Sequence, residues 1–564
     1  MIDVNKIPKE DIKSRECKFA TYCPNKETGE DLHVIKEVIH LKDGTSIPNL
    51  KMVKNFKRPF WVTRKGYQNH KDKKEWEDED RLTRYESSQV RLQQAVAKAL
   101  GTPWVRGSLR DLAASPYLYG TDISSTAVIK KKYQDTYPDS FSRFKIAAFD
   151  IETDMINGDE RAIMGSLTFK DKIYTAITKD YLKGIADAIP RLHELLNEHL
   201  KDYIKTRGLK FEIEIVNNDL DVFKRCFAKA HEWGPDFVTV WNLDFEMTKF
   251  EQSLAYHQAD PLPIVCDPSV PEEYRSFRYI RGKNKKVTAS GKVIPVRPAN
   301  RWHTALFPAK WYLIDSMCAY RHLRLSKPEE PDYSLDAILQ KHLNLTKLKF
   351  PEADKYEGER WHEFMQSNMK LPYIVYNIFD CIALELLDEK IDDLNINLPT
   401  ANEHSDFESF KSQPKRTIDD MHYFVQSHKK VIASTSSDMG DGFDDETVDL
   451  RGWIVTLPAY MVHDNGLACI KEDPGYKTNI RTFSADLDVA ASYPNGELCF
   501  NISKETTLKE LVEIHGVDAD IVKMNTINLS GGFTNAVEFC TSTLHAPTLF
   551  DLLKEYNREY KPAF

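Results

Sequence analysis

The spacing of apolar and polar positions changes at about residue 145. Before this point the chain is charge-rich, most densely at 71–80, and carries no catalytic constellation. After it, apolar runs typical of strands alternate with stretches whose apolar residues recur at helical spacing. The predicted elements are strands at 145–153, 163–169 and 173–178, a helix opened by Pro190, a strand at 211–216, a helix at 219–233 and a strand at 237–241. This order predicts a mixed sheet covered by helices.

Two carboxylates stand at the end of the first predicted strand. Because residues two apart on a strand point the same way, Asp150 and Glu152 are expected to lie side by side there. Carboxylate oxygens hold hard divalent cations, and a two-metal site requires carboxylates that converge on ions roughly 3.5–4 Å apart. Phosphodiester hydrolysis suits such a site. A solvated strand end is the alternative interpretation.

Two later segments place further candidate groups in comparable settings. The strand at 237–241 runs into Asp244 and Glu246. Tyr376 and Asp380 are four residues apart in a predicted helix and therefore share one face. The Tyr376 hydroxyl could position an attacking water there, while Asp380 completes a metal site. Together with the predicted sheet, these positions indicate a ribonuclease-H-like nuclease.

Length and composition limit the number of domains and the classes of protein to which the chain can belong. At 564 residues the chain is expected to hold three or four domains, at roughly 100–200 residues each. No uninterrupted apolar segment is long enough to span a bilayer, so no membrane partner is expected. The first residues lack the apolar core of a signal peptide, which favours a cytoplasmic protein. The nine cysteines form no Cys-x-x-Cys pair, which argues against a zinc ribbon or a disulfide framework.

A basic stretch interrupts an otherwise acidic chain. The net charge is −9, yet residues 274–314 contain no Asp or Glu. The cations in its first part are Arg275, Arg278, Arg281, Lys283, Lys285 and Lys286, with Tyr274, Phe277 and Tyr279 among them. Positive charge interleaved with aromatic rings is typical of surfaces that bind single-stranded nucleic acid. A solvated basic loop is the alternative.

Three segments resemble the exonuclease motifs of the family B DNA polymerases, in particular those of T-even-like phages. They are Phe149-Asp150-Ile151-Glu152, Asn242-Leu243-Asp244-Phe245-Glu246 and Tyr376-Asn377-Ile378-Phe379-Asp380. Segments 311–315 and 332–337 are similar to the strand and helix that precede the third motif in this family. The resemblance implies a 3′–5′ proofreading exonuclease with two Mg²⁺ or Mn²⁺ ions per active site, bound by Asp150, Glu152, Glu246 and Asp380, with Tyr376 orienting the water.

One position departs from the family pattern. The second motif usually ends in Asp, whereas the matching residue here is Glu246, so Asp244 is the alternative ligand. The basic stretch at 274–310 falls where these polymerases carry a hairpin that helps to part the primer end from its template. The resemblance therefore implies primer-template DNA and a single-stranded 3′ end as partners.

The resemblance extends into the polymerase region. Segment 483–495, followed by Asn501-Ile502-Ser503, is similar to the first polymerase motif of the family. It implies that Asp488 is a metal ligand, with Asp486 as the alternative. It also implies that Tyr493 closes the sugar pocket and that backbone amides from Leu487 onward contact the deoxynucleoside triphosphate. Arg558 and Lys561, on a predicted final helix, could contact the same triphosphate.

Two motifs that a complete family B polymerase requires are not found after Asp488: the Lys-x-x-x-Asn-Ser-x-Tyr-Gly helix and the Asp-Thr-Asp turn. The chain is therefore expected to be the N-terminal polypeptide of a split polymerase, completed by a second polypeptide that supplies them. A sliding clamp is a further candidate partner. The alternatives are a stand-alone 3′–5′ exonuclease with a remnant palm, and a non-catalytic DNA-binding subunit. If the chain is phage-encoded, its cytoplasmic location is that of the infected host cell.

The expected fold class is multidomain α/β and α+β, centred on the ribonuclease-H-like exonuclease domain. The predicted limits are an N-terminal domain at 1–140, the exonuclease domain at 141–395, a return segment and linker at 396–475, a partial palm at 476–547 and the start of the fingers at 548–564.

Overall fold

The computed structural model describes residues 7–25, 27–71, 73–74, 76–102, 108–287, 292–324, 327–397, 430–435 and 499. The chain divides into two compact units. The first comprises residues 1–61, 84–112 and 120–429, and the second comprises 62–83, 113–119 and 430–564. The predicted domain limits are not tested by this division and stay predictions. The mixed α/β class is confirmed.

The second unit is represented by a small two-stranded sheet. Its strands β5 (Trp76–Asp78) and β18 (Val431–Ala433) are antiparallel, with Glu77 opposite Ile432. Beside this pairing, Lys74 Nζ lies 2.8 Å from Glu77 Oε2, and both side chains are buried. Strands β4 (Arg58–Thr63) and β6 (Leu82–Ser87) each begin in one unit and end in the other. Strand β7 is Leu118–Tyr119.

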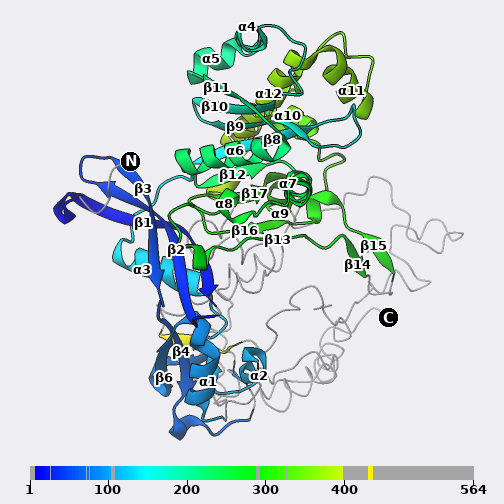
Figure 1. Cartoon of the computed structure of the whole chain (residues 1–564). Helices are drawn as coiled ribbons and strands as arrows, with labels where there is room; N and C mark the ends of the chain where they lie inside the picture. The colour runs from blue at the N-terminus through cyan, green and yellow to red at the C-terminus, as the bar shows by residue number, and fades with distance from the viewer. Residues whose placement is uncertain are drawn as a thin grey trace, which may run out of the picture. The chain divides into compact units, whose positions relative to one another are not determined.

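The first unit contains an antiparallel N-terminal sheet in the order β1-β2-β3. Its strands are β1 (Ile12–Asn25), β2 (Glu30–Leu41) and β3 (Ser46–Lys54). Helix α3 (Ser125–Thr136) begins at Ser124, whose side chain accepts a hydrogen bond from the Ala127 amide, and it packs against β1 (Figure 1). Ile35 and Ile129 join the apolar contact between sheet and helix. The other helices here are α1 (Leu92–Leu100) and α2 (Leu109–Ala113).

The larger sheet of this unit has six strands in the order β11-β10-β9-β8-β12-β17. They are β8 (Ile146–Thr153), β9 (Ala162–Phe169), β10 (Lys172–Thr178), β11 (Lys210–Val216), β12 (Phe237–Val240) and β17 (Tyr312–Asp315). Strand β9 runs antiparallel to β8 and β10, whereas β12 is parallel to β8 and β17. The strands predicted from apolar runs are confirmed.

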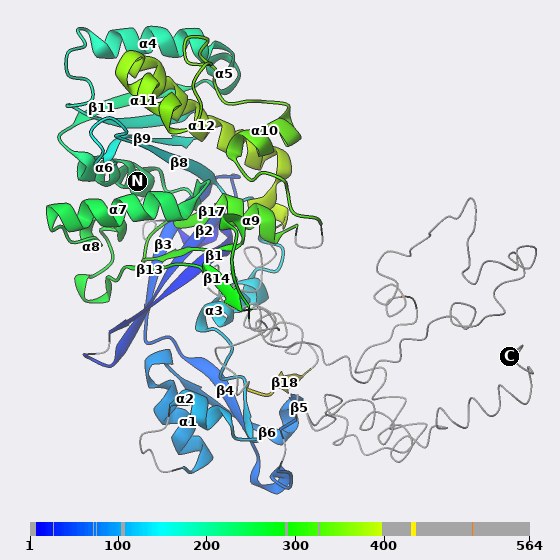
Figure 2. The same ribbon diagram turned by 90° about the vertical axis from the view of Figure 1, so that its right-hand side faces the viewer.

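Helices cover both faces of this sheet because alternate residues of its strands point to opposite sides. Phe149 packs with α6 (Asp219–Trp233), α7 (Leu243–His257) and α8 (Leu262–Val265) on one face. At Gly165 of β9, a Cβ atom would lie 2.8 Å from Val222 Cγ1, so the close approach of α6 requires glycine there. Ala148 packs with the helices of the opposite face, which are α4 (Ala188–His199), α10 (Leu335–Leu343), α11 (Glu359–Asn368) and α12 (Lys370–Ile391), with α5 (Lys201–Arg207) following α4 (Figure 2).

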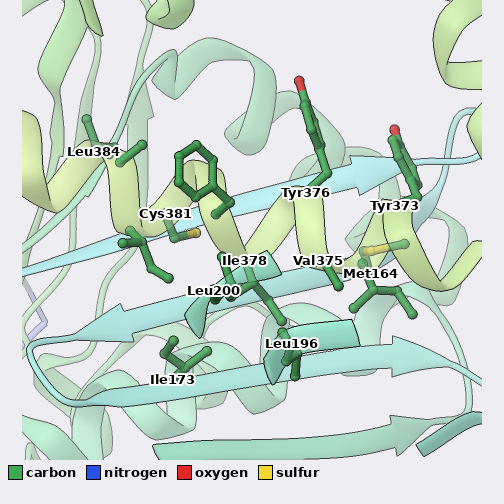
Figure 3. Close-up of a cluster of buried hydrophobic side chains, with 14 of the residues drawn as sticks. Met164, Ile173, Leu196, Leu200, Tyr373, Val375, Tyr376, Ile378, Cys381 and Leu384 are labelled. Carbon is green, nitrogen blue, oxygen red and sulfur yellow. The ribbon is translucent and has the colours of Figure 1, made fainter. Parts of the chain in front are cut away.

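Helix α12 has 22 residues and lies across β8 and β9. Its apolar side chains, including Val375, Ile378 and Cys381, face the sheet residues Met164 and Ile173 (Figure 3). The long buried run in its sequence is explained by contacts with the sheet on one side and with α4, α10 and α11 on others. This packing fixes which α12 side chains reach the end of β8.

The segment between β12 and β17 forms two short ribbons. Strand β13 (Arg278–Ile280) pairs with β16 (Thr304–Leu306), and β14 (Lys285–Val287) pairs with β15 (Val293–Pro295). Helix α9 (Ser316–His322) follows β17. None of the helices among the described residues combines the length and the apolar character needed to cross a membrane.

Candidate metal centre

Three carboxylates meet where β8 ends beside α12. Asp150 and Glu152 lie on β8, two residues apart as predicted, and Asp380 comes from α12. One oxygen from each lies within 4.8 Å of the others. Glu152 and Asp380 are buried, while Asp150 keeps some contact with solvent. The structure therefore brings together three of the residues that the sequence predicted as ligands.

Neighbouring side chains hold two of these carboxylates in place. Asn377 Nδ2 donates to Asp150 Oδ2 over 2.7 Å. The Tyr373 hydroxyl donates to Glu152 Oε2 and itself lies 2.6 Å from His362 Nδ1. Tyr373 and Asn377 are on α12 with Asp380, at spacings that share one helical face. The helix that supplies one carboxylate thus also orients the other two.

A lysine that the sequence pattern did not single out contacts one of the three carboxylates. Lys347 Nζ lies 2.6 Å from Asp380 Oδ2 and donates to the Tyr376 hydroxyl oxygen over 3.1 Å. Lys347 follows α10, and its backbone amide donates to Asp336 Oδ1 over 2.7 Å, which anchors the loop. The charge of Asp380 raises the pKa of Lys347 above its ordinary value although burial acts to lower it. The lysine is therefore a cation at this site.

The carboxylates carry more negative charge than one lysine can balance. Burial, and then the charge of Asp380, raise the pKa of Asp150 to about 7. Burial, and then the charge of Asp150, raise the pKa of Glu152 well above its usual range. The pKa of Asp380 is also raised by burial, with Lys347 opposing the shift. Each carboxylate is costly to ionise without a further cation.

Glu246 and Asp244 lie in different surroundings on the first turn of α7. Glu246 is buried, and burial followed by the charge of Asp150 raises its pKa well above the ordinary value. It is not one of the three carboxylates that lie within 4.8 Å. Asp244 instead contacts the segment between β12 and β17 that forms the two ribbons, here called the hairpin segment (residues 274–310). Its Oδ1 accepts from the Tyr279 hydroxyl at 2.9 Å and lies 3.3 Å from Arg281 Nε.

The first turn of α7 is fixed by a buried acid at the end of β17. Asp315 Oδ2 accepts from the Leu243 amide at 3.0 Å, and its Oδ1 accepts from the Cys318 amide at 2.7 Å. One carboxylate thereby caps the starts of both α7 and α9. Burial raises the pKa of Asp315 to about 6, although both amides oppose the shift. Its role is to hold Glu246 and Asp244 at the edge of the site.

Tyr376 lies beside the carboxylates, as its spacing from Asp380 predicted. Its ring stacks on Tyr373 with centroids 5.9 Å apart and contacts Trp361 at 4.8 Å. Both tyrosine hydroxyls point away from the apolar cluster beneath α12 (Figure 3). Burial, and then the charge of Asp380, raise the pKa of Tyr376, so the hydroxyl stays protonated.

The basic residues of the hairpin segment divide into two kinds. Arg275 donates to the backbone oxygens of Val270 and Pro268, and Arg281 pairs with Glu251 Oε2 at 2.5 Å. The remaining side chains of the predicted DNA-binding set are exposed on or beside the two ribbons: Arg278, Lys283, Lys285 and Lys286. These four exposed side chains are the part of the predicted set that remains a candidate DNA-binding surface.

The predicted polymerase residues lie outside the described residues: Asp486, Leu487, Asp488, Tyr493, Arg558 and Lys561. Their assignments stay predictions from sequence.

No protein-family model matches the chain, and no curated protein matches it.

Proposed function

We propose that the chain is a 3′–5′ exonuclease that hydrolyses DNA with Mg²⁺ or Mn²⁺, as the proofreading part of a family B DNA polymerase. The observation that carries the proposal is the meeting of Asp150, Glu152 and Asp380 within 4.8 Å. The setting of these residues, at the end of β8 in a mixed sheet with helices on both faces, supports the ribonuclease-H-like assignment.

The residues fit a hard divalent cation. Carboxylate oxygens are the ligands that Mg²⁺ and Mn²⁺ prefer. Asp380 Oδ1 and Glu246 Oε2 are buried without a hydrogen-bond partner among the described residues, an arrangement that costs free energy unless a ligand satisfies them. Asp150, Glu152 and Asp380 would hold the ions, and Glu246 could reach them by a change of rotamer. Bound there, two ions would stabilise the charge on the attacking and leaving oxygens of a phosphodiester.

The surrounding side chains have distinct tasks in this proposal. The Tyr376 hydroxyl, which accepts a hydrogen bond from Lys347, can donate its own proton to a water and orient it toward the phosphate. Lys347 favours the ionised form of Asp380 and adds positive charge where the phosphate would lie. Asn377 and Tyr373 hold the carboxylates of Asp150 and Glu152 in one orientation.

The test is digestion of 5′-labelled single-stranded DNA by the purified chain. We expect a ladder of products that shorten from the 3′ end with Mg²⁺ or Mn²⁺ and no products with EDTA. The double variant Asp150→Ala/Glu152→Ala should lose the activity and keep its fold, because these side chains bind metal rather than pack the core. The control is Asp171→Ala/Glu212→Ala, which removes two carboxylates that are not part of the metal centre and that pair with Lys210 and Lys229. Equal digestion by both double variants would refute the assignment.

Separate substitutions decide which acid of the second motif is the ligand. Glu246→Ala should weaken Mn²⁺ binding and lower nuclease activity. Asp244→Ala should leave the Mn²⁺ affinity close to that of the wild type, because Asp244 Oδ1 already accepts a hydrogen bond from the Tyr279 hydroxyl. The reverse result would transfer the role to Asp244.

The polymerase assignment rests on the sequence motif around Asp488. We propose that Asp488 is a metal ligand for nucleotidyl transfer, as the first polymerase motif of family B implies. Primer extension with the motifs that complete the palm supplied on a second polypeptide tests this, and the synthesis is expected to be lost in Asp488→Ala. If no synthesis is gained, the stand-alone exonuclease replaces the polymerase assignment. The non-catalytic alternative is disfavoured by the unpartnered carboxylate oxygens, since a degenerate site has no need to keep them.

A further inference from the structure

A second candidate site lies in the N-terminal part of the first unit, between the sheet β1-β2-β3 and helix α3. A cleft of about 390 Å³ opens there, within the range usual for small-molecule sites. Its floor is apolar, formed by Ile35 and Val53 from the sheet and Ile129 from the helix. The metal centre does not contribute to it. The cleft therefore can be considered independently of the nuclease.

Aromatic rings form the walls of the cleft, and two of them are held rigidly. The Tyr133 hydroxyl donates to Glu37 Oε2 over 2.5 Å, and Glu37 is buried beneath the cleft. Phe56 makes an edge contact with His33, with ring centroids 5.5 Å apart. Tyr137 completes the lining at the end of α3. Rings fixed before a ligand arrives lose little conformational entropy on binding it.

The rim of the cleft is positively charged. Arg15, Lys51 and Lys132 line it, and the lining contains no Asp or Glu. Lys51 Nζ lies 5.6 Å from the centre of the Tyr133 ring, and Lys132 Nζ lies 4.5 Å from the centre of the Phe56 ring. Neither lysine forms an ion pair with any residue that the structure describes. Two exposed ammonium groups beside fixed rings are thus available to an anion.

The buried carboxylate of Glu37 does not neutralise the positive charge of Lys51 and Lys132. Glu37 Oε1 lies 2.9 Å from Arg15 Nη1 and accepts from Asn49 Nδ2 over 2.8 Å. With the Tyr133 hydroxyl, three donors satisfy the carboxylate from inside the protein. Its charge is balanced by Arg15, so Lys51 and Lys132 remain as the net positive charge at the rim.

We propose that this cleft binds an unpaired nucleotide, with its base against the rings of Phe56, Tyr133 and Tyr137 and its phosphate at Lys51 and Lys132. Planar bases stack on aromatic side chains regardless of their identity, and lysine and arginine neutralise phosphate. An inorganic anion would leave the apolar floor unused, and an apolar ligand would leave the cations unused. The nucleotide can be free or part of a single strand.

The test is photo-cross-linking of the full chain with 8-azido-2′-deoxyadenosine 5′-monophosphate in EDTA, followed by mass-spectrometric mapping. We expect cross-links in residues 51–56 and 129–137. The variant Lys51→Glu/Lys132→Glu should reduce the apparent affinity at these residues by about tenfold or more, because it replaces two attractive charges by repulsive ones. Both lysines are exposed, so the variant should fold, which circular dichroism checks. The control Lys42→Glu/Lys98→Glu makes the same charge change at exposed lysines outside the cleft.

Mapping separates this inference from the nuclease proposal, since cross-links at the metal centre would fall on α12 or the loop of Lys347. Cross-links confined to those segments, or equal labelling of both double variants at 51–56 and 129–137, would overturn the cleft assignment. Competition then distinguishes the two sources of the ligand. A short deoxyadenosine oligomer that competes at a much lower concentration than free dAMP indicates a single strand, whereas equal competition indicates a free nucleotide.

Discussion

Replacing Asp150 by asparagine should stabilise the metal-free protein while it abolishes the nuclease. The reason is that the carboxylate is held beside Glu152 and Asp380 with only Lys347 to balance three negative charges. The amide side chain introduced by Asp150→Asn would have nearly the same shape as the carboxylate, and its oxygen could still accept from Asn377 Nδ2. The substitution therefore removes charge with little change in packing.

The pKa of Asp150 gives the size of the effect. Burial and the charge of Asp380 raise it from 3.8 to about 7 in the folded chain. A shift of roughly three units at ~1.36 kcal/mol each corresponds to an upper limit of about 4 kcal/mol. Because Asp150 keeps some solvent contact, which screens its charge, we expect about half of this, or ~2 kcal/mol. That gain corresponds to a rise in Tm of about 2–3 °C in a unit of this size.

The pH dependence has a definite sign. The folded state keeps the Asp150 proton between pH 3.8 and about 7, whereas the unfolded state loses it, so the stability of the wild type falls as pH rises through this window. The stabilising effect of Asp150→Asn should be absent near pH 4, grow up to pH 7 and stay constant above it.

Thermal unfolding in EDTA across this pH range measures the effect. Adding Mg²⁺ at pH 8 should raise the Tm of the wild type by ligand linkage and raise that of the variant less. A variant that is less stable than the wild type at pH 8 in EDTA, or a difference that does not change with pH, would refute the argument that uncompensated carboxylates strain this site.

Three further outcomes are expected. Tyr376→Phe keeps the ring stack but loses the hydroxyl, so single-turnover digestion should slow by about 100-fold with DNA affinity unchanged; equal loss of affinity would point to a binding role instead. Lys347→Met should lower the rate by about tenfold or more and raise the pH at which activity appears, because Asp380 loses its cation; a pH–rate profile measures both, and an unchanged profile would contradict it. Neutralising Lys283, Lys285 and Lys286 to Gln should flatten the salt dependence of single-stranded DNA binding by ~0.7 in the logarithmic slope per lost phosphate contact, and an unchanged slope would leave the solvated-loop interpretation.

The strands and the carboxylate pair could be predicted because their signals are local. The alternation in β8 sends Ala148 to one helical layer and Phe149 to the other, and the same alternation places Asp150 and Glu152 two residues apart. Asp380 was found through its helical spacing from Tyr376. That spacing also contained Tyr373 and Asn377, so their roles could have been inferred from the same face of α12.

Lys347 could not be predicted in this way. It lies in a loop, 33 residues from Asp380, and no periodic pattern connects the two. Charge counting over 274–314 had a related limit, since it could not separate Arg275 and Arg281, which bind within the protein, from the exposed lysines.

The N-terminal sheet β1-β2-β3 could not be predicted from the sequence pattern, because charged residues interrupt the apolar positions of its strands. Lys36 reads as a surface position, yet it is buried and donates to the backbone oxygens of Gly234 and Lys310. It also lies 3.4 Å from Asp236 Oδ1. A buried lysine is tolerated only where such partners exist, and these partners are about 200 residues or more away in the sequence. Contacts between residues so far apart in the sequence cannot be inferred from the spacing of neighbouring residues.

The most direct measurement of the central claim compares two matched single-stranded oligonucleotides labelled at the 5′ end, one with an ordinary 3′-hydroxyl and one ending in an inverted 3′–3′ linkage. We expect the purified chain to shorten the first stepwise in Mn²⁺ and to leave the second intact, and Asp150→Ala/Glu152→Ala to leave both intact. Digestion of the blocked oligonucleotide at the same rate, or stepwise digestion of the first by the double variant, would contradict the proposal that these carboxylates form a 3′–5′ exonuclease site.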